Sequence, residues 1–437
     1  MAAPERSGRL DAPLRIAWLA YRGNPHSGGQ GVYTHHLSKE LVALGHEVEV
    51  FSGPPYPELA PEVPLIKVPS LDLFRPDDPF RVPKLGEFRT RYDVAEFAIM
   101  CTAGFPEARS FSWRIRKVLQ GRQADFDIIH DNQCLGSGIL GLHKDGFPVV
   151  ATLHHPITVD RDLDIAHAPK LWRRLTLRRW YGFVGMQKRV VSQLPCVITV
   201  SQSSATDMCA QMGVRPQTAA IVPVGVDAQH FSPRPHVAKV PGRLMATTSS
   251  DVPLKGLIPL LEALAKVRTE RDDAHLVIVG KPREGSILPA AIARLGLEKA
   301  VTFRGGIDND GLVDLYAEAE LAVVPSLYEG FSLPAIETMA CGVALVATTG
   351  GALPEVVGED GDCALVVPPG DPAALASAIL RAVDDPPLRE RLGRNGRARV
   401  LDKYTWAATA KGTADVYYRF LAERGDARAR ATAGAPL

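Results

Sequence analysis

Short, largely apolar runs that alternate with longer mixed segments are the feature that most limits what this chain can fold into. Each run has the length and composition of a strand buried on both faces of a parallel sheet, and parallel neighbours need a crossover, usually a helix, between them. The runs form one series in each half of the chain, at 15–20, 47–52, 126–131, 148–153 and 196–201, and then at 244–248, 275–279, 301–303, 321–325 and 343–347. Two such series predict an α/β protein with two doubly wound, Rossmann-like domains that face a central cleft.

The size and composition of the chain fit two domains of ordinary size. It has 437 residues, of which 46% are hydrophobic and 23% charged, as in globular proteins in general. The net charge is only +1, so the overall charge gives no reason to expect nucleic acid as a partner. The polar N-terminus lacks the apolar core of a secretory signal, and no apolar run approaches the length of a membrane span. The six scattered cysteines then predict a cytoplasmic protein with reduced, buried thiols and no metal site.

Between the runs, the spacing of apolar residues predicts helices. Tyr33, Leu37, Leu41 and Leu44 fall on one face of a helix that Gly45 ends. A second helix is expected over 255–268, with leucines on one side, and a last one over 404–421.

The most specific stretch is SLYEGFSLPAIE, residues 326–337, which follows the apolar run at 321–325. Pro334 suits the first position of a helix, where its missing N–H has no effect. The stretch therefore predicts a strand, a turn and a helix, with Glu329 in the turn and Glu337 in the helix.

This arrangement predicts an anion-binding site. The N–H groups of Phe331, Ser332 and Leu333 should lie free at the helix N-terminus, where anions bind readily. Two carboxylates beside such a position suit a ligand that carries both hydroxyls and phosphate, because carboxylates accept from sugar hydroxyls while N–H groups hold phosphate. A sugar nucleotide carries both.

The stretch closely resembles the E-x7-E signature of retaining glycosyltransferases of family 4, including the Gly350-Gly351 and Pro354-Glu355 pairs that follow it. The resemblance covers most of the chain. It implies a GT-B-type fold and transfer of a hexosyl unit from a UDP-sugar or GDP-mannose to a hydroxyl acceptor, with retention of the anomeric configuration and without a cofactor or metal ion. The acceptor is a lipid, a polysaccharide or a small molecule, and the residues do not choose among these.

The same resemblance implies roles for individual residues. Glu337 matches the residue that accepts from the ribose hydroxyls, and Glu329 the one near the donor sugar and the reacting centre. Lys255, in the sequence DVPLKGL, matches the lysine that meets the diphosphate. The expected catalytic residues are His154, Glu329 and Lys255.

Two segments of the first half are expected to approach the substrates. His154 follows a predicted strand, and ligands of α/β sheets bind at the carboxyl ends of strands. It resembles the family's strand-end histidine near the donor sugar, with His155 as the alternative. The turn that contains Gly28, Gly29 and Gln30 precedes the first helix, as a tight turn or as a loop that contacts acceptor and sugar.

One position departs from the family pattern. Relatives usually carry an arginine six residues before the lysine, and here that position is Ser249. A hydroxyl replaces a bidentate guanidinium poorly. Lys281 or Arg304, at the ends of neighbouring strands, are the candidates to supply the missing donor-binding charge.

The domain limits follow from these assignments. We expect an acceptor-binding domain over 1–225, a nucleotide-sugar-binding domain over 226–403, and a helix over 404–425 that crosses back to the first domain. A long, irregular insertion is expected over 53–112, where acceptor specificity often lies. The tail after Ala422 is expected to be disordered.

Residues 170–189 combine seven basic side chains with four aromatic ones and no acidic one. They predict either a patch that contacts a membrane or another anionic surface, or a solvated basic helix whose aromatic residues pack on the core.

Two functions of different classes remain open on the sequence. The first is an active glycosyltransferase with a nucleotide-sugar donor and a hydroxyl acceptor. The second is a non-catalytic sugar-nucleotide-binding or scaffold protein that has lost the arginine at Ser249. Nucleotide binding without transfer would distinguish the second from the first.

Overall fold

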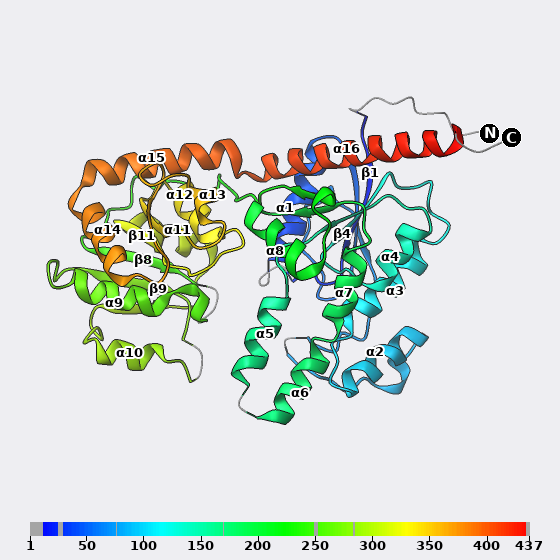
Figure 1. Cartoon of the computed structure of the whole chain (residues 1–437), viewed down its shortest axis with the longest axis horizontal. Coiled ribbons are helices and arrows are strands. Elements are labelled where there is room, and N and C mark those ends of the chain that lie inside the picture. Colours follow the sequence, from blue (N-terminus) through cyan, green and yellow to red (C-terminus); the bar gives the residue numbers. More distant parts are fainter. Residues whose placement is uncertain are drawn as a thin grey trace. The chain divides into compact units, whose positions relative to one another are not determined.

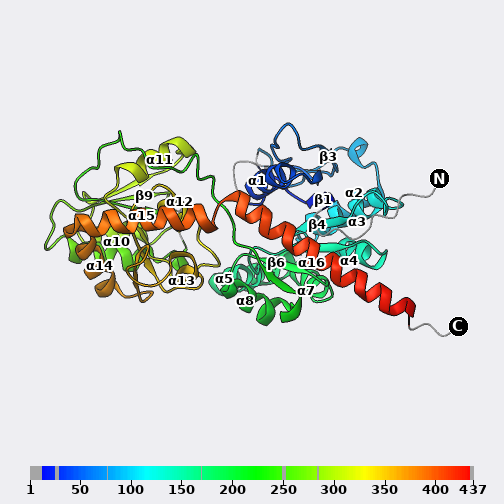
Figure 2. The same ribbon diagram turned by 90° about the horizontal axis from the view of Figure 1, so that it is seen from above.

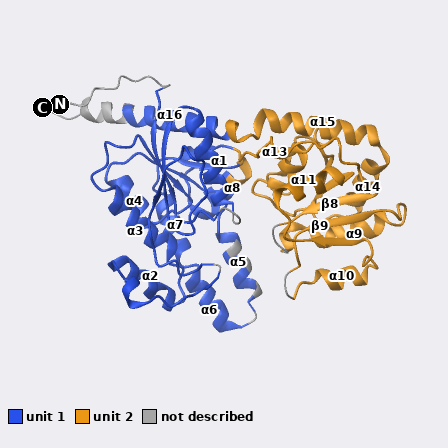
Figure 3. Cartoon of the chain, turned by 180° about the vertical axis from the view of Figure 1, so that it is seen from behind, with its two compact units in different colours: residues 1–200, 205–222, 409–437 blue, residues 201–204, 223–408 orange. Residues whose placement is uncertain are grey.

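The computed structural model describes residues 12–24, 29–75, 77–168, 170–248, 252–282 and 285–433. The chain forms two compact units. Unit 1 comprises Met1–Val200, Ala205–Val222 and Thr409–Leu437, and unit 2 comprises Ser201–Ser204 and Pro223–Ala408 (Figure 3).

Unit 1 is built on a seven-stranded parallel sheet (Figure 1). Its strands, in the order in which they lie side by side, are β3 (Leu65–Lys67), β2 (Glu47–Ser52), β1 (Arg15–Ala20), β4 (Ile128–Asn132), β5 (Val149–Thr152), β6 (Val197–Thr199) and β7 (Ala219–Ile221). Its helices are α1 (Gln30–Ala43), α2 (Arg91–Cys101), α3 (Glu107–Leu119), α4 (Ser137–Lys144), α5 (Thr158–His167), α6 (Leu171–Trp180), α7 (Phe183–Val191), and most of α8 (Gln202–Met212) and of α16 (Trp406–Ala433). The chain leaves β1 toward β2 on one side and returns to β4 on the other, so the topological switch point lies between β1 and β4.

Unit 2 repeats the plan with six parallel strands. Their order is β10 (Val301–Arg304), β9 (His275–Val279), β8 (Arg243–Thr247), β11 (Leu321–Val324), β12 (Leu345–Thr348) and β13 (Leu365–Val367). The helices are α9 (Leu257–Val267), α10 (Leu288–Arg294), α11 (Asn309–Glu318), α12 (Leu333–Ala340), α13 (Leu353–Val357), α14 (Pro372–Asp384) and α15 (Pro386–Lys403). Here the switch point lies between β8 and β11. The predicted pair of doubly wound α/β domains is confirmed.

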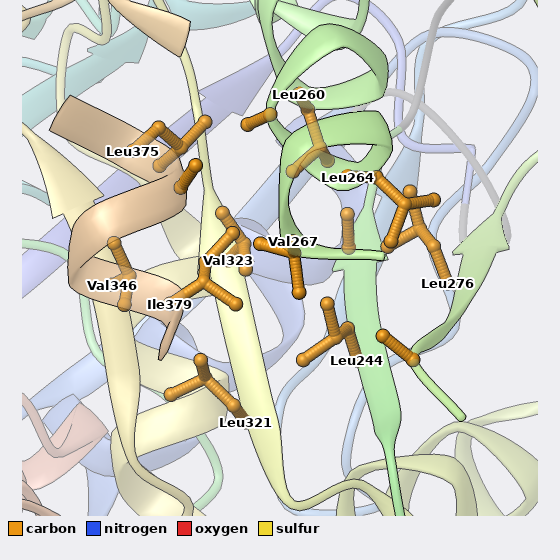
Figure 4. Packing of buried hydrophobic residues seen from close by; sticks show 14 of the residues in the cluster. Leu244, Leu260, Leu264, Val267, Leu276, Leu321, Val323, Val346, Leu375 and Ile379 are labelled. Atoms are coloured by element: carbon orange, nitrogen blue, oxygen red, sulfur yellow. The ribbon is translucent and has the colours of Figure 1, made fainter. Parts of the chain in front are cut away.

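The helix patterns are largely confirmed as well. The apolar face of α9 is fully buried, and its leucines pack with strand residues such as Leu276 and Val323 in the core of unit 2 (Figure 4). In α1 the residues Tyr33, Leu37 and Leu41 are buried, but Leu44 is 48% exposed, so the predicted face ends one turn early. Leu44 is the C-cap of α1, where the chain turns away at Gly45.

Several predictions for less regular segments were wrong. Residues 53–112 are loop-rich over much of their length, but they also contain β3, α2 and the start of α3, which were not predicted. Short edge strands such as β3, β7 and β13, with three residues each, were missed because runs of this length carry no clear pattern. The tail after Ala422 is not disordered up to Ala433, because α16 continues through this segment.

Helix α16 belongs to unit 1 for most of its length (Figure 1 and Figure 2). The hydroxyl of Tyr417 lies 2.6 Å from Nδ1 of His130 on the central strand β4, and both side chains are fully buried. Tyr418 donates to the carbonyl of Ala12, 2.9 Å away. These contacts attach the end of the chain to the core of the unit that also contains its beginning.

The cysteines form no disulfide. Four of the six are buried as expected, whereas Cys209 is half-buried and Cys101, at the end of α2, is exposed. Among the described residues, no helix is both long and apolar enough to cross a lipid bilayer.

Candidate active site

The turn between β11 and α12 has the predicted order of strand, turn and helix. Ser332 is the N-cap of α12, and its Oγ accepts from the N–H of Ala335 at 3.4 Å. Leu333 is the first helical residue, so Pro334 occupies the second position and not the first. Ser332 adopts a φ of 102°, a backbone conformation that a residue with a side chain rarely accepts. Such strain is typical of functional turns.

Glu329, in this turn, is held by two side chains from different segments. Its Oε1 accepts from Nζ of Lys255 at 2.8 Å and from Oγ of Ser326 at 2.7 Å. The Lys255 and Glu329 side chains are 22% and 11% exposed, so the ion pair is largely shielded from water. Lys255 ends a short 3-10 turn after β8, and Glu329 follows β11, so the two meet at the switch point of unit 2.

The downstream glycines allow the Glu329 turn to pack against the next loop. A Cβ on Gly351 would lie 2.2 Å from the carbonyl oxygen of Glu329, and Gly351 has a φ of 64°. A Cβ on Gly350 would lie 2.7 Å from the carbonyl oxygen of Ser326. The N–H of Ala352 donates to Glu329 O at 2.8 Å. These glycines therefore permit close approach between two segments of this chain. The sequence did not reveal this reason for glycine at positions 350 and 351.

Glu337 lies in α12 and takes part in a second polar contact. Its Oε2 accepts from the hydroxyl of Tyr316 at 3.3 Å, and that hydroxyl lies 3.0 Å from Oγ1 of Thr247 at the end of β8. Burial raises the pKa of Glu337 to about 7, and the bond from Tyr316 opposes this rise. A carboxyl group with such a pKa changes its charge near neutral pH, so a hydroxyl-bearing ligand that bonds to it would favour the ionised form.

The backbone N–H groups of Phe331, Ser332 and Leu333 make no hydrogen bond with other described residues. The ring of Phe331 is buried edge-on against Tyr404, with 5.7 Å between the ring centres, whereas Leu333 is 44% exposed. The N-terminus of α12 therefore has three N–H groups without a partner among the described residues, and their predicted role in anion binding stays a prediction.

The position of the missing arginine, Ser249, lies outside the described residues. Lys281 and Arg304 follow or end β9 and β10, at the same edge of the sheet as Lys255, and both are exposed. Among the described residues, neither forms a hydrogen bond or ion pair with Glu329.

In unit 1, the glycine turn leads into α1. Gly28 lies outside the described residues, Gly29 is the N-cap of α1 with a φ of 69°, and Gln30 is the first helical residue. A Cβ on Gly31 would lie 2.1 Å from the carbonyl oxygen of Asn24, so only glycine fits there. Helix α1 is the next element along the chain after β1, the strand that borders the switch point of this sheet.

His154, two residues beyond β5, lies in a polar network with this turn. Its Nε2 lies 2.8 Å from Oδ1 of Asn132, whose Nδ2 donates to the carbonyl of Gln30 and to the hydroxyl of Thr34, at 3.4 and 3.2 Å. Because the Gln30 carbonyl can only accept, it fixes the orientation of the Asn132 amide, and Nε2 of His154 must be the donor to Oδ1. The neutral imidazole then has its lone pair on Nδ1.

Burial lowers the pKa of His154 to about 4, so the imidazole is neutral at pH 7. The ring of Tyr33 packs edge-on against it, with 4.5 Å between the ring centres. A neutral ring with one donor and one acceptor nitrogen can orient a sugar hydroxyl without adding charge. His155, the alternative, is exposed.

Sequence reasoning missed the residues that support His154. Asn132 ends β4, and the next residue, Gln133, accepts from the N–H of His154 at 2.7 Å through Oε1. Gln133 and Leu135 have φ values of 56° and 50°, so the loop after β4 is strained like the turn at Ser332. The polar end of an otherwise apolar run, IIHDN, was the available indication.

The basic and aromatic segment 170–189 splits into two parts. Phe183 is buried, and Trp180 packs against Phe105 with 5.3 Å between ring centres. Leu171 and Trp172 remain 71% and 63% exposed on α6, where no residue is buried. Among the aromatic residues of this segment, Trp180 and Phe183 therefore pack on the core, whereas Trp172 does not.

Among the described residues, no group of three or more His, Cys, Asp or Glu side chains is arranged to hold a metal ion.

Comparison with known proteins relates both halves of the chain to one class of enzyme. The model of Glycosyltransferase Family 4 matches residues 27–230, and the model of glycosyl transferases group 1 matches residues 231–399. The MMP alpha-(1->4)-mannosyltransferase of Mycolicibacterium hassiacum is 50% identical to this chain over 410 residues, which cover 94% of this chain and 99% of that protein. The D-inositol 3-phosphate glycosyltransferase of Streptomyces bingchenggensis is 29% identical in an alignment that covers 97% of this chain and 92% of that protein.

Solved structures show the same fold. The sucrose-phosphate synthase from Thermosynechococcus elongatus matches with a TM-score of 0.68 and 23% identity, over 94% of this chain and 100% of that chain. WaaG, a glycosyltransferase involved in lipopolysaccharide biosynthesis, matches with a TM-score of 0.62 and 18% identity, over 92% and 99%. The two Rossmann-like units, the matches to both family models and the 50% identity with the Mycolicibacterium hassiacum protein agree. This chain therefore belongs to the family 4 glycosyltransferases of the GT-B fold, which act on sugar-nucleotide donors.

Proposed function

We propose that this protein is a retaining hexosyltransferase that moves a mannosyl unit from a nucleoside diphosphate sugar to a hydroxyl of a glycan acceptor. The ion pair of Lys255 and Glu329 at the switch point of unit 2 is the observation that carries the proposal. It brings a cation to the turn that holds a carboxylate and the free N–H groups of the α12 N-terminus, which suits a ligand with a diphosphate and sugar hydroxyls.

The choice of mannose comes from the similarity to the Mycolicibacterium hassiacum protein, whose name gives an alpha-(1->4)-mannosyltransferase. Sugar nucleotides of mannose carry an α-linkage to phosphate, so an α-linked product retains the configuration of the donor. The base of the donor, guanine or uracil, stays open.

We assign the donor diphosphate to Lys255 and the N–H groups of Phe331, Ser332 and Leu333. Cleavage of the bond between the sugar and the diphosphate leaves negative charge on the leaving group, which these preorganised donors stabilise. Glu337 accepts from the ribose hydroxyls. Unit 2 is then the nucleotide-sugar-binding part of the chain.

Unit 1 receives the acceptor in this proposal. His154 accepts a hydrogen bond from a hydroxyl of the transferred sugar at Nδ1, because Asn132 fixes its Nε2 as the donor. Gly29 and Gln30 border the same network.

The proposal is tested by calorimetric titration of the purified protein with GDP and with UDP, first without metal and then with Mg²⁺. Micromolar binding of one nucleotide without metal, followed by product formation from the matching sugar nucleotide, supports the assignment. An α-linked product, identified by NMR, supports retention. Binding without any transfer would instead favour the non-catalytic alternative, which nothing in the comparisons supports.

A peripheral membrane contact through residues 170–189 is a separate part of the proposal. Leu171, Trp172 and Leu175 are exposed on α6 beside arginines such as Arg173 and Arg178, a composition that favours anionic lipid surfaces. Sedimentation with vesicles of anionic phospholipid at low salt tests the contact. If the protein stays in the supernatant, the acceptor is reached without membrane attachment.

A further inference from the structure

A groove on unit 1, outside the two clusters described above, has the composition of a carbohydrate-binding site. It has a volume of about 740 Å³ and lies along α2 and α3 and at the end of α4, which neighbour one another in Figure 1. Its lining residues are Arg91, Tyr92, Trp113, Arg116, Lys117, Gln120, Gln123 and Asp145. We propose that this groove binds a neutral oligosaccharide, as a second glycan site that is separate from the transfer reaction.

The aromatic side chains supply the first part of the argument. The rings of Tyr92 and Trp113 lie 6.2 Å apart and are inclined by 35°, so they form a short platform with a spacing close to that of successive sugar rings in a glycan. Both rings are half-buried. The indole nitrogen of Trp113 donates to Oγ of Ser137 at 2.9 Å, which fixes the orientation of the ring. Fixed aromatic rings bind the apolar faces of sugars at little entropic cost.

Planar polar groups lie beside this platform. Nε and Nη2 of Arg116 each donate to a carboxylate oxygen of Asp145 at 2.8 Å, and the two side chains are 48% and 36% exposed. The Arg116 side chain lies across Gly141 of α4, where a Cβ would come within 2.6 Å of it. This bidentate pair, with the amides of Gln120 and Gln123, offers both donors and acceptors to hydroxyl groups.

The charge of the groove favours a neutral ligand over an anion. The guanidinium of Arg116 is already paired with Asp145, and that of Arg91 lies over the ring of Tyr92, 5.2 Å from its centre. Of the lining cations, Lys117 alone has no ion pair or ring contact with the residues that the structure describes. Arg91 and Lys117 thus have no ion pair among the described residues, and because both are exposed, each contributes little to the binding of an anion.

The wall formed by α2 is fixed by a buried charge cluster. Nη2 of Arg114 on α3 donates to Asp93 and Glu96 on α2, at 2.7 and 2.5 Å, and the three side chains are 7%, 8% and 1% exposed. Such a cluster is costly to bury and is best explained by the specific orientation that it imposes. Here it sets the register of α2 on α3 and thereby places Tyr92 beside Trp113.

The test uses the whole protein labelled with 5-fluorotryptophan and observed by ¹⁹F NMR. The chain has five tryptophans, and Trp113→Phe assigns the signal of interest. The probe is an α-(1→4)-linked mannotetraose, a choice that rests on the proposed function, and maltotetraose serves as a second neutral probe. We expect the Trp113 signal alone to shift, saturably, with one of these probes in the millimolar range.

Variants keep the result independent of the transfer site. Arg116→Ala, at an exposed position, should weaken the binding about tenfold, the equivalent of one strong polar contact. Lys255→Ala should leave the Trp113 shift unchanged even if it abolishes transfer, so failure of this inference and failure of the proposed function give different results. Trp172→Phe, on exposed α6, is the matched control and should have no effect.

Two outcomes would overturn the inference. One is a Trp113 signal that does not move with either neutral probe. The other is a shift that a sulfated oligosaccharide or inorganic phosphate produces and the neutral probes do not, which would make the groove an anion site.

Discussion

The ion pair between Lys255 and Glu329 leads to a prediction about nucleotide affinity and the rate of sugar transfer. In the structure the lysine charge is already engaged by the carboxylate at 2.8 Å. A diphosphate must therefore compete with Glu329 for the same ammonium group. Replacing Glu329 by glutamine removes the competitor but keeps the shape of the side chain and an oxygen acceptor for Ser326. We expect Glu329→Gln to bind a nucleoside diphosphate more tightly while transferring sugar more slowly.

The size of the effect follows from the geometry. At 2.8 Å and an effective dielectric constant of about 20, the attraction between Lys255 and Glu329 is about 6 kcal/mol before desolvation is subtracted. The side chains are 22% and 11% exposed, and removing both from water offsets most of this attraction. A net contribution of about 1–2 kcal/mol remains, which corresponds to nucleotide binding about tenfold tighter in Glu329→Gln.

The lysine variant should behave in the opposite way. Lys255→Ala removes a preorganised cation from the leaving group and should lower kcat by about 10²–10³-fold, the equivalent of about 3–4 kcal/mol. It also leaves the shielded Glu329 carboxylate with Ser326 as its remaining described partner, which should destabilise the fold by about 1–3 kcal/mol.

A double-mutant cycle with calorimetry, steady-state kinetics and urea unfolding measures all of these terms. In the double variant, the effects on stability should be non-additive by at least about 1 kcal/mol. Lys266→Ala, an exposed lysine on α9, controls for the loss of one positive charge. Nucleotide affinity that falls in Glu329→Gln, or additive effects in the double variant, would refute this account of the site.

Three further predictions concern the supporting residues. Asn132→Ala should slow transfer about tenfold or more without changing nucleotide affinity, because His154 loses the acceptor that fixes its tautomer. Asn132→Asp, which keeps an acceptor, should recover part of the rate. Equal rates in both variants would contradict the role of Asn132 in fixing the tautomer of His154. Tyr316→Phe should weaken binding of a nucleoside diphosphate about threefold to tenfold but leave binding of inorganic pyrophosphate unchanged. The reason is that its partner Glu337 is assigned to the ribose, which pyrophosphate lacks. Equal losses of affinity for both ligands in calorimetry would exclude that assignment. The free energy of unfolding should fall in acid. His154 has a pKa of about 4 in the folded state and 6.5 in the unfolded state, so the unfolded chain binds a proton first as the pH falls. The neutral His154 therefore contributes at most about 3 kcal/mol to stability above pH 6.5, and this contribution is lost as the pH falls toward 4. Urea unfolding at several pH values measures this slope, and the slope should be smaller in His154→Gln; an unchanged slope would assign the acid sensitivity to other groups, among them the buried His130.

Much of the fold could be read from local patterns. The strands at 15–20, 47–52 and 275–279 were predicted to the residue, because fully buried parallel strands are short apolar runs with clear ends. Other predicted boundaries differ from the structure by one or two residues, as for β4 and β12. Within 53–112, α2 was missed because its buried face consists of Asp93 and Glu96, which no hydrophobic pattern can reveal.

The sequence by itself determined the two Rossmann-like series, the strand, turn and helix around Glu329, and the family to which the chain belongs. These depend on neighbours a few residues apart, whose spacing fixes backbone conformation and a short motif. Only the tertiary structure decided that Lys255 pairs with Glu329, 74 residues away, and that Asn132 sets the tautomer of His154. Such contacts arise where parallel strands end at the same edge of a sheet, and the order of strands in a sheet is a property of the packed chain that no local pattern contains.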